Sequence, residues 1–370
     1  MVKKEYPFYI KSTIVLLGLV LSVYILINLR DILVPVAFSI IISILLNPVV
    51  NRLKRFKLSN VVAISLTLLL AIVIVASIFY FLSSQIAGFA DNMPLLKSKF
   101  AMLLHQLQEW LQAKFGIAIQ KQVQLLNEGL NSSKTLIGST LGTALGTLTI
   151  VILLPVYTFM LLFYKSLILN FLYEVFATEN AGQVQEILDQ TKTSIQSYMV
   201  GLLLEALIIA ILNSTALMIL GVKYAILLGV IGAFLNMIPY LGGIIAIALP
   251  VLIATITKDG FSTQFGVIIA YTIIQFVDNN FIVPRVVSSK VQINALFSII
   301  IVLLGGAMWG ISGMFLSIPL VAIIKIIFDR IDGLKPWGKL LGDEVPTRHL
   351  GQFLRRRKKK ESLSEKIVEN

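Results

Sequence analysis

The chain has 370 residues, of which 57% are hydrophobic and 14% charged, and its mean hydropathy is +0.89. An ordinary soluble domain carries about 25% charged residues, so this composition excludes a water-soluble fold. The absence of cysteine excludes disulfides, and the two distant histidines, His105 and His349, argue against a Cys/His metal site. The net charge of +12 is dominated by the basic run 355–360, which we interpret as a marker of the cytoplasmic side and not as a nucleic-acid-binding segment.

Three apolar stretches open the chain. Ile14–Leu29 and Ile32–Val50 are separated by two polar residues, which predicts a tight helical hairpin, and Val61–Leu82 follows. These lengths are close to the roughly 20 residues that a membrane-spanning helix needs. The loop Asn51–Asn60 contains basic residues and no acidic one. The positive-inside rule therefore places this loop and the N-terminus in the cytoplasm.

Residues 83–140 contain no apolar run long enough to span a bilayer, so we expect an extracytoplasmic insertion. Apolar side chains recur there at intervals of three and four, the period of an amphipathic helix. They are Leu96, Phe100, Leu103, Leu107 and Trp110. The pattern predicts a helical cap or hairpin whose stripe packs on its neighbours; the alternative is a ligand-binding lid.

A fourth span, Leu141–Phe163, is entered through Gly138, Gly142 and Gly146. Their spacing of four predicts one small helix face, which favours close packing either within one subunit or between subunits of a homo-oligomer. The stretch Val184–Tyr198 is amphipathic again. We expect it to form a helix at the cytoplasmic membrane interface.

The C-terminal half is nearly all apolar. Its four segments are Val200–Gly221, Tyr224–Thr257, Phe265–Val283 and Ala295–Phe328. The sequence therefore predicts an all-α integral membrane protein with about eight transmembrane helices, two of them broken by glycine and proline or re-entrant. It also predicts the extracytoplasmic insertion and places both termini in the cytoplasm. The expected parts are residues 1–82, with three spans; 83–140, the insertion; 141–199, the fourth span and interfacial helix; 200–328, a transport core; and 329–370, a basic tail.

Two of these segments are too long for one straight helix, and both are interrupted by glycine and proline. Proline removes a helical hydrogen bond and glycine lets the backbone unwind. Irregular backbone at membrane depth is tolerated only where protein buries it or where it lines a water-filled cavity, and paired interruptions are a pointer to transporter sites. The alternative is that both are merely kinked helices. The candidate positions are Asn236, Pro239, Gly242 and Gly243 in the first segment, and Gly305, Gly306 and Gly310 in the second.

Few ionisable residues lie inside the apolar segments. Glu205 is one, with Asn213 further along the same helix, and Asp278 is another, followed by Asn279. Each such residue costs about 2.5–3.5 kcal/mol to insert at a helix centre and is retained with a partner or a purpose. A desolvated carboxyl favours its neutral form and could exchange a proton for a cation. The alternative is a structural ion pair between Asp278 and Arg285, two turns apart.

These blocks together resemble the AI-2E (autoinducer-2 exporter) family of bacterial membrane proteins. The resemblance covers nearly the whole chain and is most specific in its C-terminal half. It rests on Glu205–Gly221, on the block Asn236–Gly243, on 278–280 with Pro284-Arg285, and on Gly305-Gly306 through Pro319. The chain departs from the family pattern at Gly243, where proline is usual, at Asp278, where Glu is common, and at 286–295, which lacks the usual Met-Gly and His-Pro pairs.

The resemblance implies an inner-membrane permease, since members are linked to export of autoinducer-2 and others to sodium(lithium)/proton antiport. The candidate partners are a small polar solute, a monovalent cation, a proton and the lipid bilayer. No cofactor is expected, and without nucleotide-binding or hydrolase motifs neither is an enzyme. A membrane scaffold and a passive channel remain as alternatives.

Overall fold

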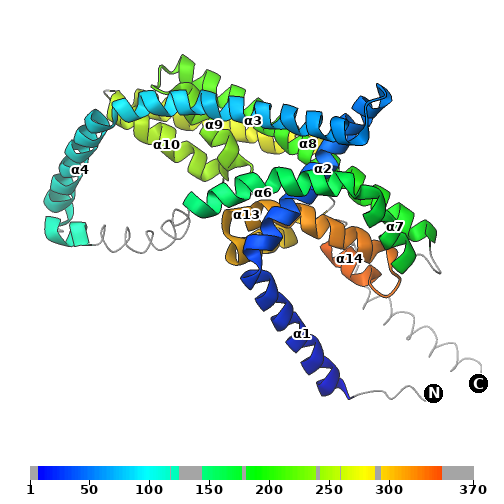
Figure 1. Ribbon diagram of the computed structural model, residues 1–370. Coiled ribbons are helices and arrows are strands. Elements are labelled where there is room, and N and C mark those ends of the chain that lie inside the picture. The colour runs from blue at the N-terminus through cyan, green and yellow to red at the C-terminus, as the bar shows by residue number, and fades with distance from the viewer. Residues whose placement is uncertain are drawn as a thin grey trace, which may run out of the picture.

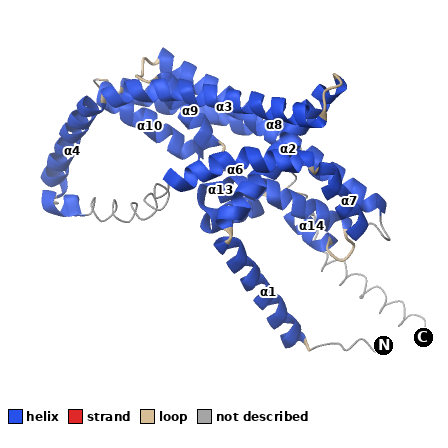
Figure 2. Ribbon diagram, in the orientation of Figure 1, coloured by secondary structure: helices blue, strands red, loops and turns tan. Residues whose placement is uncertain are grey.

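The computed structural model describes residues 7–116, 118–124, 144–176, 181–238, 242–258, 260–287 and 293–343, and all regular structure in these ranges is helical (Figure 2). The predicted all-α membrane fold is confirmed. The helices, labelled as in Figure 1, are α1 (Phe8–Asn28), α2 (Arg30–Arg55), α3 (Asn60–Asp91), α4 (Met93–Phe115), α6 (Ala144–Phe163), α7 (Lys165–Phe176), α8 (Ala181–Ile219), α9 (Ala225–Asn236), α10 (Gly242–Thr257), α11 (Ser262–Val277), the π-helix η1 (Asp278–Ile282), α12 (Val283–Val286), α13 (Ala295–Arg330) and α14 (Lys335–Leu341).

Among the described residues, six helices are long and apolar enough to cross a membrane. By length and composition alone they are α1, α2, α3, α8, the continuous run Ser262–Val286 and α13, the last of which is interrupted at Gly310. The pair α6 and α7, bent by 62°, would make a seventh. About eight spans were predicted, and the difference lies in the segment Tyr224–Thr257, which forms two shorter apolar helices in place of one long helix.

That segment folds back on itself as the hairpin of α9 and α10, with 12 and 16 residues in its two arms. The helices pack against each other (Figure 1). Gly242 permits the sharp return, because a Cβ there would lie 2.6 Å from the Cα of Asn236. Two arms this short do not each reach across a hydrocarbon core of about 30 Å. The first overlong segment is therefore a re-entrant helical hairpin, and its tip lies inside the helix bundle.

The second overlong segment, α13, also turns back. Gly310 has φ 62° and ψ −144°, a backbone conformation outside the helical region. The hydroxyl of Ser317 donates to the carbonyl oxygen of Ile301 at 3.1 Å, although these residues would be about 24 Å apart along a straight helix. Gly305 and Gly313 face each other across this hairpin, where a Cβ on Gly305 would lie 2.6 Å from the Gly313 carbonyl oxygen. Both glycine-rich interruptions thus build hairpins and not kinks.

Two other expectations differ in detail. The amphipathic stretch Val184–Tyr198 is not a separate interfacial helix, because it continues without a break into the next span as α8. The helix predicted in the insertion exists as α4, which lies at the end of the molecule remote from α7 and α14 (Figure 1). Of its apolar stripe only Leu96 is buried, while Phe100, Leu107 and Trp110 are exposed. Residues 125–140 of the predicted insertion, Gly138 among them, and Gly142 lie outside the described residues.

Two apolar clusters flank the centre of α8. One joins the C-terminal half of α8 to α9, α10 and α11, through Leu217, Leu228 and Val267 among others. The second joins the N-terminal half of α8 to α2 and α13, through Ile195 and Leu316 among others. Glu205 lies on α8 between these clusters, at the depth reached by the tip of the α9–α10 hairpin. The fold therefore brings a re-entrant tip and a carboxylate together inside the bundle.

Candidate functional site

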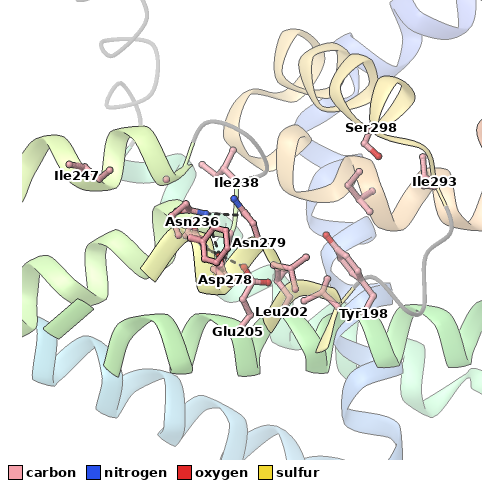
Figure 3. A pocket seen from close by; sticks show the side chains of 18 of the residues that line it. Tyr198, Leu202, Glu205, Asn236, Ile238, Ile247, Asp278, Asn279, Ile293 and Ser298 are labelled. Carbon is pink, nitrogen blue, oxygen red and sulfur yellow. Dashed lines mark hydrogen bonds between the residues drawn. The ribbon is translucent and has the colours of Figure 1, made fainter. Parts of the chain in front are cut away.

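A cavity of about 840 Å³ lies where α8, the α9–α10 tip, η1 and the start of α13 meet (Figure 3). Its walls are largely apolar. The described residues that line it include no Lys, Arg or His. Its polar side chains are Tyr198, Glu205, Asn236, Thr272, Gln275, Asp278, Asn279 and Ser298.

Two acidic residues of the cavity share one amide. The side-chain nitrogen of Asn236 donates to Asp278 Oδ2 at 2.8 Å and to Glu205 Oε1 at 3.3 Å (Figure 3). Glu205 is 6% exposed and Asp278 1% exposed. Because Asn236 is the last residue of α9, the hairpin tip itself connects α8 to η1. The three residues were predicted as candidates from separate blocks of sequence, and the fold brings them together.

Gln275 extends this network. Its side-chain nitrogen lies 3.5 Å from Asp278 Oδ2 and 3.3 Å from Asn279 Oδ1. Gly243 leaves the space for this amide, because a Cβ there would approach the Gln275 Cδ to 2.9 Å. A second carboxylate oxygen, Asp278 Oδ1, is buried and has no hydrogen-bond partner among the described residues. Asp278 thus retains an unused acceptor.

Arg285 does not pair with Asp278. Its guanidinium lies 5.9 Å from the centroid of the Phe281 ring, and its side chain is exposed. The physical reason is the π-helix at Asp278–Ile282, which holds more residues per turn than an α-helix and rotates the residues after it around the helix axis. The structural ion pair considered from the sequence is therefore absent, and Arg285 lies outside the lining of the cavity.

The remaining candidates have separate positions. Gly305, Gly306 and Gly310 belong to the α13 hairpin and do not line the cavity. Asn213 lies two turns beyond Glu205 on α8, buried and outside the cavity lining. Gly242 shapes the tip without lining the cavity. Pro239 lies outside the described residues.

Several lining residues were missed by sequence reasoning. Gln275 precedes Asp278 by three residues, so helical spacing could have placed it on the same face. Tyr198, Thr272 and Ser298 carry no local signal that separates them from other polar residues of apolar helices. Tyr198 and Ser298 lie across the cavity from the Asn236 network (Figure 3), and only the tertiary structure brings them there.

Comparison with known proteins identifies the family. A family model described as AI-2E family transporter matches residues 13–333. The chain belongs to the AI-2E transporter family. It is 26% identical over 336 residues to the AI-2 transport protein TqsA of Escherichia coli, covering 89% of this chain and 95% of TqsA. It is also 26% identical over 314 residues to the putative transport protein YueF of Bacillus subtilis, covering 80% of this chain and 83% of YueF.

A relative from Haemophilus influenzae, named putative transport protein, is 25% identical over 339 residues, with 89% of this chain and 96% of the relative covered. The full-length matches support membrane transport as the general activity of this AI-2E family member. The described residues hold no group of three or more His, Cys, Asp or Glu side chains that could bind a metal ion. Two carboxylates with neighbouring amide oxygens are instead the oxygen-only donor set that suits hard cations.

Proposed function

We propose that this AI-2E family member is a bacterial inner-membrane secondary transporter in which Glu205 and Asp278 couple transport to a proton or a monovalent cation. The observation that carries the proposal is the buried pair of carboxylates held by the single amide of Asn236.

A carboxylate buried without a positive partner is strongly disfavoured, so it is neutralised by a proton or by a cation. Neutralisation is favoured further when two carboxyl groups share one donor, because like charges at close range disfavour simultaneous ionisation. No basic side chain is among the described residues of the cavity. Proton and cation therefore compete for the same oxygens, and such competition is the basis of exchange.

The size of the cavity supports a second ligand. Sites for small organic molecules typically occupy about 300–1,000 Å³, and this cavity of about 840 Å³ falls within that range. A monovalent cation alone needs far less. We propose that a small polar solute occupies the apolar-walled space while the carboxylates bind the coupling ion. The named activity of TqsA makes autoinducer-2 one solute to test.

The test uses the full-length protein in liposomes that contain a pH-sensitive dye. An inward sodium gradient is imposed, and proton movement is followed for the wild type, Glu205→Gln and Asp278→Asn. Both substitutions keep the size and remove the charge, so we expect each to abolish sodium-driven proton movement. Glu109→Gln, on the exposed surface of α4, is the matched control and should behave as the wild type.

Three outcomes would count against the proposal. Wild-type rates in both carboxamide variants would remove Glu205 and Asp278 from coupling. Solute flux, measured in the same liposomes, that does not change with the imposed sodium gradient or with an imposed proton gradient would indicate a passive channel. No flux at all, with a phenotype that depends on α4, would favour a scaffold.

A further inference from the structure

A second set of buried polar side chains lies beyond the cavity, between α8 and α11. On α11, Tyr271 follows Gln264 by seven residues and Gln275 follows Tyr271 by four. Asp278 comes three residues after Gln275, so all four side chains lie on one helix face. On α8, Asn213 follows Glu205 by eight residues on the corresponding face. The two helices pack against each other. A polar stripe thus continues from the carboxylates toward the N-terminal end of α11.

The stripe converges at Gly232 of α9. A Cβ at this glycine would lie 3.2 Å from Asn213 Nδ2 and 3.6 Å from the Tyr271 hydroxyl oxygen. An amide from α8 and a hydroxyl from α11 therefore meet at the position where α9 has no side chain. The surrounding residues, including Leu217, Leu228 and Val267, are apolar and buried.

These polar side chains are deeply buried and incompletely bonded. Asn213 is 2%, Tyr271 4% and Gln264 6% exposed. Asn213 Oδ1, the Tyr271 hydroxyl, Gln264 Oε1 and Asp278 Oδ1 have no hydrogen-bond partner among the described residues. One such group costs about 1–3 kcal/mol when left unsatisfied, and buried polar groups in native proteins commonly obtain their missing partner from an internal water.

We propose that Asn213, Tyr271 and Gln264 hold a file of water molecules that carries protons between Asp278 and the N-terminal end of α11, on the far side of the carboxylates from Tyr198. This polar file, defined by those three residues, rests on the proposed ion coupling and names the proton's route. In each transfer an oxygen of water or of Tyr271 accepts one proton and releases another, so the file is chemically unchanged. The amides of Asn213 and Gln264 position water and give up no proton.

The route complements the cavity. The cavity extends from the carboxylates toward Tyr198 and Ser298, whereas the polar file runs the other way along α8 and α11. The proposed polar file would deliver a proton to Asp278 from the side opposite to the solute cavity.

The first measurement is the proton assay in liposomes with Tyr271→Phe and Gly232→Ala. The first removes the hydroxyl and the second narrows the point of convergence. Loss of one hydrogen bond in the file raises the barrier by an amount equivalent to about tenfold in rate, so we expect sodium-driven proton movement to slow by about that factor. Tyr80→Phe, on the exposed surface of α3, and Gly88→Ala, where no atom lies within 4 Å of the new Cβ, are matched controls.

The second measurement is radiolytic footprinting of the wild-type protein, which labels buried side chains that contact bound water. After correction for intrinsic reactivity, we expect labelling of Tyr271 to exceed that of Leu217, which is also fully buried, and to fall in Gly232→Ala. Unlabelled Tyr271 overturns the polar file whatever the transport result. Wild-type proton rates in both variants overturn it as well, while the proposed coupling stands. If the wild type moves no protons, the proposed coupling fails and the proton route fails with it, and labelling of Tyr271 then shows only that water is bound there.

Discussion

Asn236 on the α9–α10 hairpin donates to Asp278 on η1 at 2.8 Å, although 42 residues separate them in the chain. The same nitrogen reaches Glu205 on α8. Hydrogen bonds thereby join the tip of the α9–α10 hairpin to α8 and η1, through two acidic side chains that are themselves candidates for ion binding. Any movement of the hairpin must change the environment of both carboxylates.

Replacement of Asn236 is the most direct test of these hydrogen bonds. Asn236→Ala removes donors to two acidic side chains, and hydrogen bonds to charged groups contribute about 1.5–3 kcal/mol each. We expect the free energy of unfolding of the purified protein in detergent to fall by about that amount or more. Asn280→Ala is the control, because Asn280 is exposed and donates to Phe276 of its own helical turn; equal losses in the two variants would argue that Asn236 has no special role.

Substitution of Gly310 should destabilise the fold, and the reason is backbone conformation alone. Its φ of 62° with ψ of −144° is a combination essentially restricted to glycine, while a new Cβ would meet no atom within 4 Å. Gly310→Ala should therefore lower the unfolding free energy by about 1–3 kcal/mol. Gly88→Ala inside α3 should instead stabilise by about 0.5–1 kcal/mol, since alanine is the better helix former. The same unfolding assay compares the two variants. An unchanged free energy of unfolding in Gly310→Ala would contradict the backbone turn at Gly310.

The α13 hairpin can be tested by a disulfide. Ser317 donates to the Ile301 carbonyl, whereas a straight helix would separate these residues by about 24 Å, far beyond the roughly 7 Å Cα separation that a disulfide tolerates. The chain has no cysteine, so Ile301→Cys with Ser317→Cys gives a clean background. Oxidation should crosslink this pair within one chain. Val61→Cys with Ser77→Cys, at the same separation in the uninterrupted α3, should remain reduced.

The proposed orientation predicts opposite labelling of two exposed positions. Arg55 ends α2 and Lys114 lies near the end of α4. In spheroplasts, a membrane-impermeant maleimide should label the Lys114→Cys variant directly. It should label the Arg55→Cys variant only after the membrane is permeabilised. The reverse pattern would invert the topology and place the N-terminus outside.

The sequence predicted those features that depend on residues close together in the chain. Apolar run length predicted α1, α2 and α3, since a bilayer imposes a minimum helix length on any chain. Helical periodicity predicted α4, and the scarcity of ionisable residues in apolar surroundings selected Glu205 and Asp278 as candidates. Whether those two residues act in transport is still a prediction, which the liposome assay addresses.

Other features depended on contacts between distant segments. The glycine and proline interruptions marked the overlong segments, but a kink and a fold-back differ only in what the two arms touch. Close approach at Gly242 and Gly305 decided for hairpins in both segments. Only the α9–α10 hairpin, whose helices are short, drops out of the set of helices long enough to cross a membrane. The π-helix turned Arg285 away from Asp278, which α-helical spacing did not anticipate.

By itself the sequence determined that this AI-2E family member is an all-α membrane protein and which residues are costly to bury, because hydropathy and desolvation act on each segment independently of the rest. The tertiary structure decided that Asn236, Glu205 and Asp278 form one network, that the two hairpins fold back, and that Asn213 and Tyr271 meet at Gly232. Those relationships arise from packing between helices far apart in the chain, where the small volume of a glycine or one extra residue in a turn sets which side chains come into contact.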